Sequence, residues 1–146
     1  MDGAGIAAIL ALGAQAAQLG TAFVSCPESA ADEEYKKALR SEEALHTVMT
    51  RVISGRPARG LANELTSLEN DLSLASIPSY PFTYDAAKTL HAIAEVQGNQ
   101  DFAARWAGQS AALSRSMTAG ELVEVLKEEI TAALKPLSNR GWLRSL

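Results

Sequence analysis

A glycine and a threonine near the start of the chain could bind an anion. They fall near the end of Ala14–Phe23, a stretch with few polar side chains, which is typical of a parallel strand covered by helices on both faces. At Gly20 and Thr21 a bare backbone N–H and a hydroxyl are suitable donors for a phosphate. The alternative is that Gly20 relieves crowding at a strand end and Thr21 is an ordinary strand residue.

A second group of donors lies further along the chain. Tyr84 and Lys88 are four residues apart and would lie one above the other on a helix, whereas Tyr80 joins them only if the chain folds back. Phenol hydroxyls and an ammonium group supply donors and positive charge, which suit an anionic ligand. From the residues alone, a surface pair between Asp85 and Lys88 beside a tyrosine at a helix start is the favoured interpretation.

Two arginines and two histidines are weaker candidates. Arg56 and Arg59 share a glycine-rich turn that could hold a phosphate or a carboxylate, but we expect them first to pair with acidic residues or nearby carbonyl groups. His46 and His91 lack metal-ligand spacing and a catalytic arrangement. Each is therefore expected to be a surface residue or a hydrogen-bonded helix residue, and the sequence predicts no metal site.

The elements that would position these groups are mostly helices. A capping box at Thr118–Glu121 and a possible cap at Thr83 mark two helix starts, and Phe102 and Trp106 form an i,i+4 packing pair. The patterns predict helices over Gly5–Gly13, Ala31–Leu45, from Leu61 onward, Tyr84–Gln97, Phe102–Ala107 and Thr118–Pro136, with a second strand over Thr47–Ile53. A parallel strand needs parallel neighbours, so the sequence predicts the end of a larger α/β domain, beginning within a repeating unit.

Composition indicates a globular piece of one domain. The chain has 146 residues, of which 47% are hydrophobic and 21% charged, and its mean hydropathy is near zero. A net charge of −4 argues against nucleic acid or an anionic membrane as partner. The single Cys26 favours a reducing compartment, and the acidic Asp2, with Lys36 as the first basic residue, argues against an export signal. We therefore expect a cytoplasmic location.

Five phrases in one order carry a resemblance to a known family. They are Gly5–Ala8 with Ala11–Ala14, Gln18–Phe23 followed by Cys26–Ser29, Ser54–Leu61, Tyr80–Lys88, and Trp106–Gln109. Together they resemble the C-terminal part of bacterial nitronate monooxygenases, formerly called 2-nitropropane dioxygenases, over residues 3–130.

The resemblance implies an α/β fold. The chain would be the C-terminal fragment of an FMN-binding TIM (β/α)8 barrel with an attached, mostly helical substrate domain, and would be helix-rich in isolation. Residues 1–60 would hold the last helix and strand of the barrel and the following segment, residues 61–135 part of the substrate domain, and residues 136–146 a tail.

The resemblance also implies a chemistry. FMN would carry out the one-electron oxidation of an alkyl nitronate, oxygen would reoxidise the flavin, and the products would be a carbonyl compound and nitrite. By the same resemblance, two sets of residues would serve FMN and the substrate pocket: Gln18, Gly20 and Thr21 for the cofactor, and Tyr80, Tyr84 and Lys88 for the substrate. This reverses the preference for a surface pair.

The resemblance leaves the catalytic residue unknown. Neither His46 nor His91 matches the glycine-flanked histidine motif of the family, which belongs to the barrel part outside this chain. The isolated chain is therefore expected to lack a complete flavin site and to be inactive alone.

Two alternatives stay open. A flavin-dependent enoyl-acyl-carrier-protein reductase shares the Gly–Thr phrase, but that group tends to carry an arginine where this chain has Ala22, and it lacks the Tyr80–Lys88 phrase. The other alternative is a non-catalytic helical remnant or interaction module, which self-associates through an open strand edge.

Overall fold

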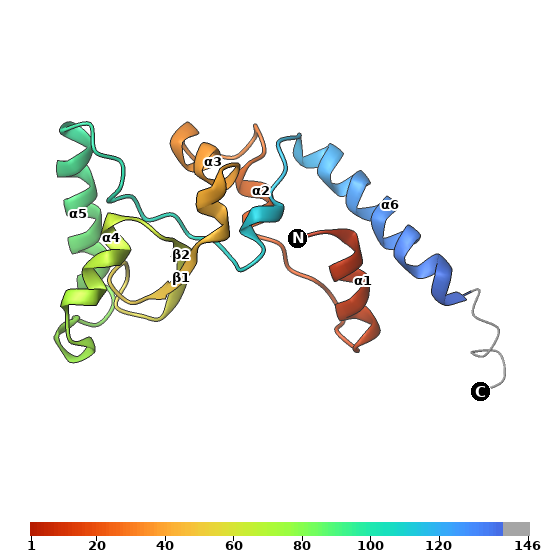
Figure 1. Ribbon diagram of the computed structural model, residues 1–146, viewed down its shortest axis with the longest axis horizontal. Helices are drawn as coiled ribbons and strands as arrows, with labels where there is room; N and C mark the ends of the chain where they lie inside the picture. The colour runs from red at the N-terminus through yellow and green to blue at the C-terminus, as the bar shows by residue number, and fades with distance from the viewer. Residues whose placement is uncertain (139–146) are drawn as a thin grey trace. The chain divides into compact units, whose positions relative to one another are not determined.

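The computed structural model describes residues 1–138, which form two compact units (Figure 1). The first unit consists of Met1–Ala30 and the chain from Leu113 onward, and the second consists of Ala31–Ala112. Helices predominate, as predicted, and no helix in the described part is both long and apolar enough to cross a membrane. The predicted domain boundaries at residues 60 and 135 refer to a whole barrel and stay a prediction.

The first unit is built from α1 (Gly3–Ala11), α2 (Thr21–Val24) and α6 (Ala119–Ser138). The Asp2 carboxylate caps α1 by accepting a hydrogen bond from the Gly5 N–H at 2.8 Å. The chain leaves α1 through Gly13, whose φ of +100° is the left-handed conformation that favours glycine after a helix. This confirms the predicted helix closed by a glycine.

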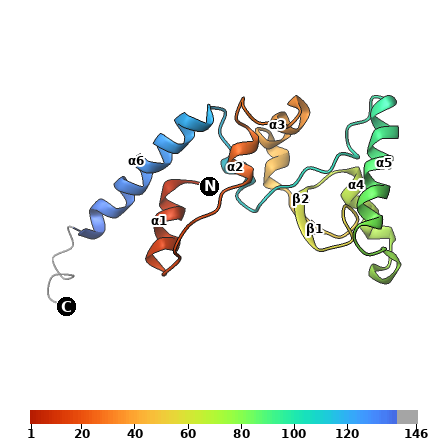
Figure 2. The same cartoon turned by 180° about the vertical axis from the view of Figure 1, so that it is seen from behind.

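Helices α1 and α6 lie side by side because a glycine lets their backbones approach (Figures 1 and 2). A Cβ atom added to Gly3 would lie 2.4 Å from the Glu129 Cβ and 2.6 Å from the Ile130 backbone nitrogen. The Gly3 N–H donates to the Glu129 carboxylate at 2.7 Å. The unit has its own hydrophobic core, which comprises Ile6, Ala22, Cys26, Leu122 and Leu126.

Helix α6 begins at the predicted capping box. The Glu121 carboxylate accepts a hydrogen bond from the Thr118 N–H at 2.8 Å, and the Glu121 N–H donates to the Thr118 hydroxyl at 3.3 Å. Leu134, predicted to face inward, is 44% exposed. The helix also continues past Pro136 to Ser138, so the prediction that Pro136 ends it is wrong. Most of the predicted tail lies outside the described residues.

The second unit combines a β-hairpin with short helices. In chain order it contains α3 (Glu33–Leu39), the 3-10 helix η1 (Glu42–Leu45), β1 (Thr47–Thr50), β2 (Ala58–Leu61), α4 (Glu64–Ser67), the 3-10 helices η2 (Leu68–Asp71) and η3 (Leu74–Ser76), and α5 (Phe82–Val96), and the 3-10 helix η4 (Ala111–Leu113) follows. Strands β1 and β2 pair antiparallel, with Thr47 opposite Leu61 (Figure 2). Strand β1 lies within the predicted strand, whereas β2 was not predicted because alanine and glycine are depleted in strands.

Apolar side chains from the turn after β1, from α4 and from α5 form the core of the second unit. Ile53, Leu65 and Ala87 are buried in it, and Leu90 packs against them. Ile93, predicted to share the buried stripe of α5, is instead 55% exposed. The buried face of α5 is therefore narrower than its sequence pattern indicates.

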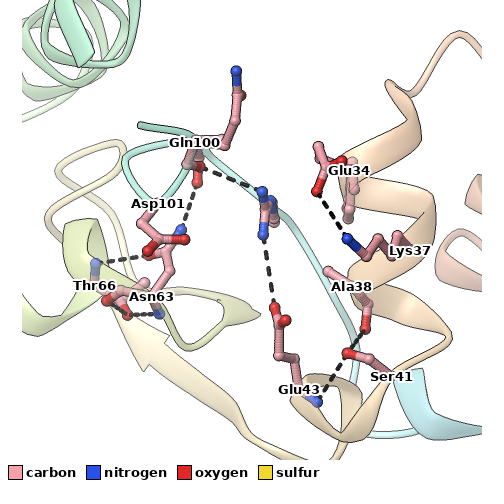
Figure 3. Close-up of polar contacts among 12 residues, drawn as sticks. Glu34, Lys37, Ala38, Ser41, Glu43, Asn63, Thr66, Gln100 and Asp101 are labelled. Atoms are coloured by element: carbon pink, nitrogen blue, oxygen red, sulfur yellow. Dashed lines mark hydrogen bonds and ion pairs between the residues drawn. The ribbon is translucent and has the colours of Figure 1, made fainter. Parts of the chain in front are cut away.

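Side-chain hydrogen bonds at the start of α4 connect this helix to a distant part of the chain (Figure 3). The Asn63 side-chain oxygen accepts a hydrogen bond from the Thr66 N–H at 3.0 Å, and the Asn63 backbone N–H donates to the Thr66 hydroxyl oxygen at 2.9 Å, which is a capping box. The Asn63 side-chain amide also donates to the Ala103 carbonyl at 2.8 Å. A single residue therefore both starts α4 and holds the segment after α5.

Helix α3 is attached to the same segment through Tyr35. Its hydroxyl donates a hydrogen bond to the Trp106 carbonyl. Burial raises the pKa of Tyr35 to about 12, because the charged phenolate is disfavoured away from water. Nearby, the buried Arg105 guanidinium lies 3.7 Å from the Glu43 carboxylate of η1. These contacts stabilise the second unit rather than forming an open site.

The strand predicted over Ala14–Phe23 is wrong. Residues 12–20 are irregular, and Thr21–Val24 form α2. A parallel strand needs neighbours that bond to its backbone groups, and the sheet within the described residues is the antiparallel hairpin alone. The apolar side chains of the stretch instead pack against the core of the first unit. The open edge that led us to expect self-association is thus absent from the described residues, and self-association itself stays a prediction.

The short helix predicted over residues 102–107 is also wrong. The segment is irregular and bonds to β2: the Leu61 N–H donates to the Arg105 carbonyl at 2.8 Å, and Gly60 and Trp106 form an isolated bridge. Gly60 permits this contact, because an added Cβ would lie 2.8 Å from the Arg105 carbonyl oxygen. The prediction that Phe102 and Trp106 take part in packing is confirmed, since both aromatic rings pack against the core.

The helix predicted over Ala31–Leu45 is divided into α3 and η1. The Ser41 hydroxyl interrupts it by donating to the Ala38 carbonyl at 3.0 Å and accepting from the Glu43 N–H at 3.2 Å. Leu45, predicted on the buried side, is 67% exposed as a result.

Two other predicted helix starts are displaced. The helix predicted from Leu61 begins at Glu64, because Leu61 belongs to β2. Helix α5 begins at Phe82, and Thr83 lies inside it. The Thr83 hydroxyl donates to the Pro78 carbonyl at 2.6 Å instead of capping the helix.

Candidate functional site

Two tyrosines and two cationic side chains of the second unit form a row in space, in which each side chain lies beside the next. We call this group, Arg56, Tyr80, Tyr84 and Lys88, the tyrosine–cation row. The Tyr80 and Tyr84 ring centres are 6.3 Å apart with 33° between the ring planes. The Lys88 Nζ lies 5.3 Å from the centre of the Tyr84 ring, and the Arg56 Cζ lies 5.1 Å from that of Tyr80, both within cation–π range. The structure thus brings together the three residues predicted for the substrate pocket and adds a fourth.

The first turns of α5 and the residues before it position the two tyrosines. Tyr84 and Lys88 lie one helical turn apart on α5. Tyr80 precedes the helix in a turn closed by the Phe82 N–H, which donates to the Ser79 carbonyl at 3.1 Å. The chain therefore folds back, as the sequence required for Tyr80 to join the other two.

Gly55 holds the arginine turn against the tyrosine segment. Its φ is +80°, and an added Cβ would lie 2.5 Å from the Pro78 carbonyl oxygen and 2.6 Å from the Tyr80 backbone nitrogen. Neither this conformation nor this contact admits a side chain. Arg56 follows directly, and its carbonyl accepts a hydrogen bond from the Ser54 hydroxyl at 3.2 Å. This role of Arg56 was not predicted, and the available signal in the sequence is the glycine that precedes it in the turn.

The row carries two positive charges that no carboxylate of the described residues neutralises. Within the described part of the chain, neither Arg56 nor Lys88 takes part in a salt bridge. The Asp85–Lys88 surface pair, which the residues alone favoured, is therefore not formed. Tyr80 is 49% exposed, so its side chain is accessible to a ligand. Phenol donors beside cations are a suitable arrangement for binding an anion.

The three residues predicted to contact a cofactor lie in the first unit. Gln18 and Gly20 are exposed, and Thr21 is the first residue of α2. The φ of Gly20 is −107°, and an added Cβ would meet no atom within 4 Å, so neither conformation nor packing requires glycine here. The Gln18 amide and the Thr21 hydroxyl are donor groups of the kind that binds a phosphate such as that of FMN. These residues could form one wall of a phosphate site.

A cavity of about 340 Å³ adjoins this wall. Gly20 and Phe23 line it together with Glu28. The Glu28 carboxylate accepts a hydrogen bond from the Ala119 N–H at 3.0 Å, so its charge is directed to the start of α6.

Of the other candidates, Arg59 has a structural role and the two histidines have no assigned role. The Arg59 guanidinium donates to the Thr47 carbonyl at 2.9 Å, which confirms the expected carbonyl contact. His46 is exposed, but the Nε2 of His91 is buried without a hydrogen-bond partner among the described residues, so the prediction for His91 is wrong. The part of the chain that the structure describes contains no cluster of side chains able to hold a metal ion.

Comparison with known proteins confirms the resemblance. Residues 1–129 match the nitronate monooxygenase family. Nitronate monooxygenases from Paraburkholderia phytofirmans and Pseudomonas aeruginosa are 53% and 51% identical to this chain over 137 and 130 residues. The matches cover 94% and 89% of this chain but 37% of each relative, so the chain spans little more than a third of their length.

Two solved structures are similar to this chain. The nitroalkane oxidase from Streptomyces ansochromogenes matches with a TM-score of 0.82 at 40% identity, covering 94% of this chain and 39% of that one. FabK from Thermotoga maritima matches with a TM-score of 0.73 at 28% identity, covering 94% and 43%. With a family match over most of its length and relatives above 50% identity, this chain belongs to the nitronate monooxygenase family.

Proposed function

We propose that this chain is part of an FMN-dependent nitronate monooxygenase, in which the tyrosine–cation row binds the anionic substrate. The observation that carries the proposal is the row itself, in which two phenols lie between two cations that have no carboxylate partner among residues 1–138. A nitronate carries negative charge on its two oxygens, so phenol O–H groups and an ammonium group are complementary to it. The names of the curated relatives support this assignment.

The two units of the chain would have different tasks. Lys88 supplies positive charge near the nitronate, while Tyr80 and Tyr84 donate hydrogen bonds to its oxygens. Gln18, Gly20 and Thr21 would hold the FMN phosphate through neutral donors. When bound, FMN supplies the oxidation of the nitronate, which with oxygen as the second substrate yields a carbonyl compound and nitrite.

We propose further that the rest of the site lies outside this chain. The chain spans 37% of its curated relatives, and neither of its histidines matches the family's histidine motif. The chain would correspond to the C-terminal part of a TIM barrel with its attached substrate domain. We therefore expect the isolated chain to bind the substrate anion but to release no nitrite.

The substrate side can be tested with a charged ligand and its neutral counterpart. Ethyl nitronate added to the chain is expected to shift the NMR signals of the Tyr80 and Tyr84 rings, because the anion contacts the row. Nitroethane has the same carbon skeleton without the charge and is expected to shift them far less. Equal shifts with both compounds would contradict anion binding at the row.

The cofactor side can be tested with two glycines that are equally free of neighbours. An added Cβ meets nothing within 4 Å at either Gly20 or Gly120, so valine should be tolerated at both. We expect weak FMN binding to the chain by flavin fluorescence, which Gly20→Val weakens and Gly120→Val leaves unchanged. Tight stoichiometric binding of FMN would refute the view that other walls are needed, and an unchanged Gly20→Val would refute the role of Gly20.

A flavin-dependent enoyl-acyl-carrier-protein reductase is the second candidate, since that group shares the Gly20–Thr21 phrase. Ala22 and the Tyr80–Lys88 phrase argue against it. In a protein that contains this chain within a complete barrel, nitrite release from a nitronate supports the first candidate, and NADH oxidation with an enoyl thioester supports the second. A non-catalytic interaction module would do neither.

A further inference from the structure

A buried threonine of α5 is bonded to the segment that carries Tyr80. The Thr83 hydroxyl donates a hydrogen bond to the Pro78 carbonyl at 2.6 Å, and the residue is only 7% exposed. We propose that Thr83 is a positioning residue of the tyrosine–cation row, whose hydroxyl holds the turn that places Tyr80 beside Tyr84. The inference rests on the proposed function and deepens it, because it names a residue that acts on the substrate through Tyr80.

The hydrogen bond from Thr83 joins α5 to the residues before it. In a helix, a threonine hydroxyl usually bonds to the carbonyl three or four residues earlier. Thr89 does so on the same helix, where it donates to the Asp85 carbonyl at 2.9 Å. The bond from Thr83 instead reaches five residues back to Pro78, past the start of α5 at Phe82. It therefore fixes an irregular segment to the helix rather than one helical turn to the next.

The Pro78 carbonyl is held from two sides. Thr83 bonds to it from α5, and Gly55 lies against it from the arginine turn, where an added Cβ would be 2.5 Å from the same oxygen. Two of the residues around Tyr80, Pro78 and Pro81, have no backbone N–H, so this segment has fewer backbone donors of its own. Loss of the Thr83 hydroxyl is therefore expected to release Tyr80 from its place in the row.

Removal of the hydroxyl alone tests the proposal. Thr83→Val keeps the shape of the side chain and suits its surroundings, since Thr83 lines an apolar cavity of about 200 Å³. We expect this variant to fold, as circular dichroism would show, but to shift the NMR signals of the Tyr80 ring. Its affinity for ethyl nitronate is expected to fall about fivefold, the effect of losing one neutral hydrogen bond.

The conservative variant tests whether the donor itself is responsible. Thr83→Ser keeps the hydroxyl and is expected to restore both the Tyr80 ring signals and the affinity for ethyl nitronate. Should Thr83→Val not fold, Thr83→Ser and Thr83→Ala isolate the same group, because these two variants differ only in the hydroxyl. Equal affinities in the serine and alanine variants would overturn the proposal.

Thr89 provides the matched control on the same helix. Thr89→Val removes a hydrogen bond of the same kind, but from a carbonyl inside α5 and not from the Tyr80 segment. This variant is expected to keep the ring signals and the affinity of the wild type. If Thr89→Val weakens binding as much as Thr83→Val does, the effect belongs to the helix as a whole and the positioning role is refuted.

A double variant shows whether Thr83 acts through Tyr80. Tyr80→Phe removes the phenol donor and is expected to weaken the binding of ethyl nitronate about fivefold by itself. Adding Thr83→Val to Tyr80→Phe is then expected to change the affinity no further, because the group that Thr83 positions is already absent. Additive losses from the two substitutions would overturn the positioning role.

The outcomes separate this inference from the proposed function. If the wild type and Thr83→Val bind ethyl nitronate equally well, the positioning role is refuted and the proposed function stands. If the wild type does not bind ethyl nitronate, the proposed function is refuted, and the Tyr80 ring signals decide whether Thr83 places Tyr80 in the row. A shift in Thr83→Val but not in Thr89→Val supports that placement, and unchanged signals in both refute it.

Discussion

Replacing Gly55 with alanine tests how the tyrosine–cation row is assembled. The added Cβ would lie 2.5 Å from the Pro78 carbonyl oxygen and 2.6 Å from the Tyr80 nitrogen. Both are backbone atoms, so the segment that carries Tyr80 must move. Because Arg56 is adjacent to the substitution, its contact with the Tyr80 ring is expected to be lost as well.

Two free-energy costs determine how much Gly55→Ala destabilises the folded chain. An alanine at a φ of +80° costs about 1–2 kcal/mol of conformational free energy. The overpacked contact adds about 1–3 kcal/mol, the usual range for inserting atoms where none fit. We therefore expect Gly55→Ala to lower the free energy of unfolding by about 2–5 kcal/mol.

Gly98 provides the matched control in the same unit. Its φ is +77°, but an added Cβ would meet nothing within 4 Å. Gly98→Ala should therefore show only the conformational cost of about 1–2 kcal/mol. The difference between the two variants isolates the contact with the tyrosine segment.

Urea unfolding followed by circular dichroism measures both variants, and NMR of the tyrosine rings reports the position of Tyr80. Gly55→Ala should be the less stable variant and should shift the Tyr80 ring signals, whereas Gly98→Ala should not shift them. If the two variants are equally stable, or if the Tyr80 signals are unchanged in Gly55→Ala, the account of how the row is positioned is refuted.

Two further substitutions test titrating groups outside the row. Tyr35→Phe removes the hydrogen bond to the Trp106 carbonyl and is expected to cost about 1–2 kcal/mol in urea unfolding. Burial raises the pKa of Tyr35 to about 12 from its ordinary value of 10.0, so this stabilisation is complete below pH 10 and is lost as the pH rises towards 12. Ultraviolet titration should show a late-ionising phenol that Tyr35→Phe lacks, and its presence in the variant would contradict the assignment. The hydrogen bonds that Glu129 accepts from the Arg115 side chain and the Gly3 N–H lower the pKa of its carboxyl below the ordinary 4.5. This stabilisation is present above pH 4.5 and is lost as the pH falls through the lowered pKa, so Glu129→Gln should lose stability less steeply in acid than the wild type, and identical acid profiles would contradict this.

Two local signals in the sequence predicted helix ends correctly. The capping box at Thr118 and the glycine after α1 act within a few residues, so the sequence contains the whole interaction. The strand predicted over the apolar run before Thr21 is wrong because an alanine-rich stretch with few polar residues fits both a buried strand and an irregular segment packed on helices. Strand β2 was not predicted because its residues have weak strand propensity. Its pairing with β1 and with residues 105–107 outweighs that propensity.

The candidate site could be predicted only in part, because only some of its contacts are between residues close in the sequence. The spacing of Tyr84 and Lys88 follows from helix geometry, and the sequence therefore placed these two together. The contact of Arg56 with Tyr80 joins segments far apart in the chain, and only the glycine before Arg56 gave a sign of it. No local pattern indicated the apolar cavity of about 200 Å³ in the second unit, because it forms only where the stretch of residues 65–90 folds back on itself and on Val52.

The affinity of the chain for ethyl nitronate tests the central claim most directly. Lys88→Met removes the ammonium group at the row, and Lys37→Met removes an exposed lysine of the same unit that pairs with Glu34 at 3.8 Å. Loss of a charged hydrogen bond of about 1.5 kcal/mol should weaken binding roughly tenfold in Lys88→Met. Lys37→Met should bind as the wild type does. Equal affinities for the wild type and both variants would contradict the claim that the tyrosine–cation row binds the nitronate.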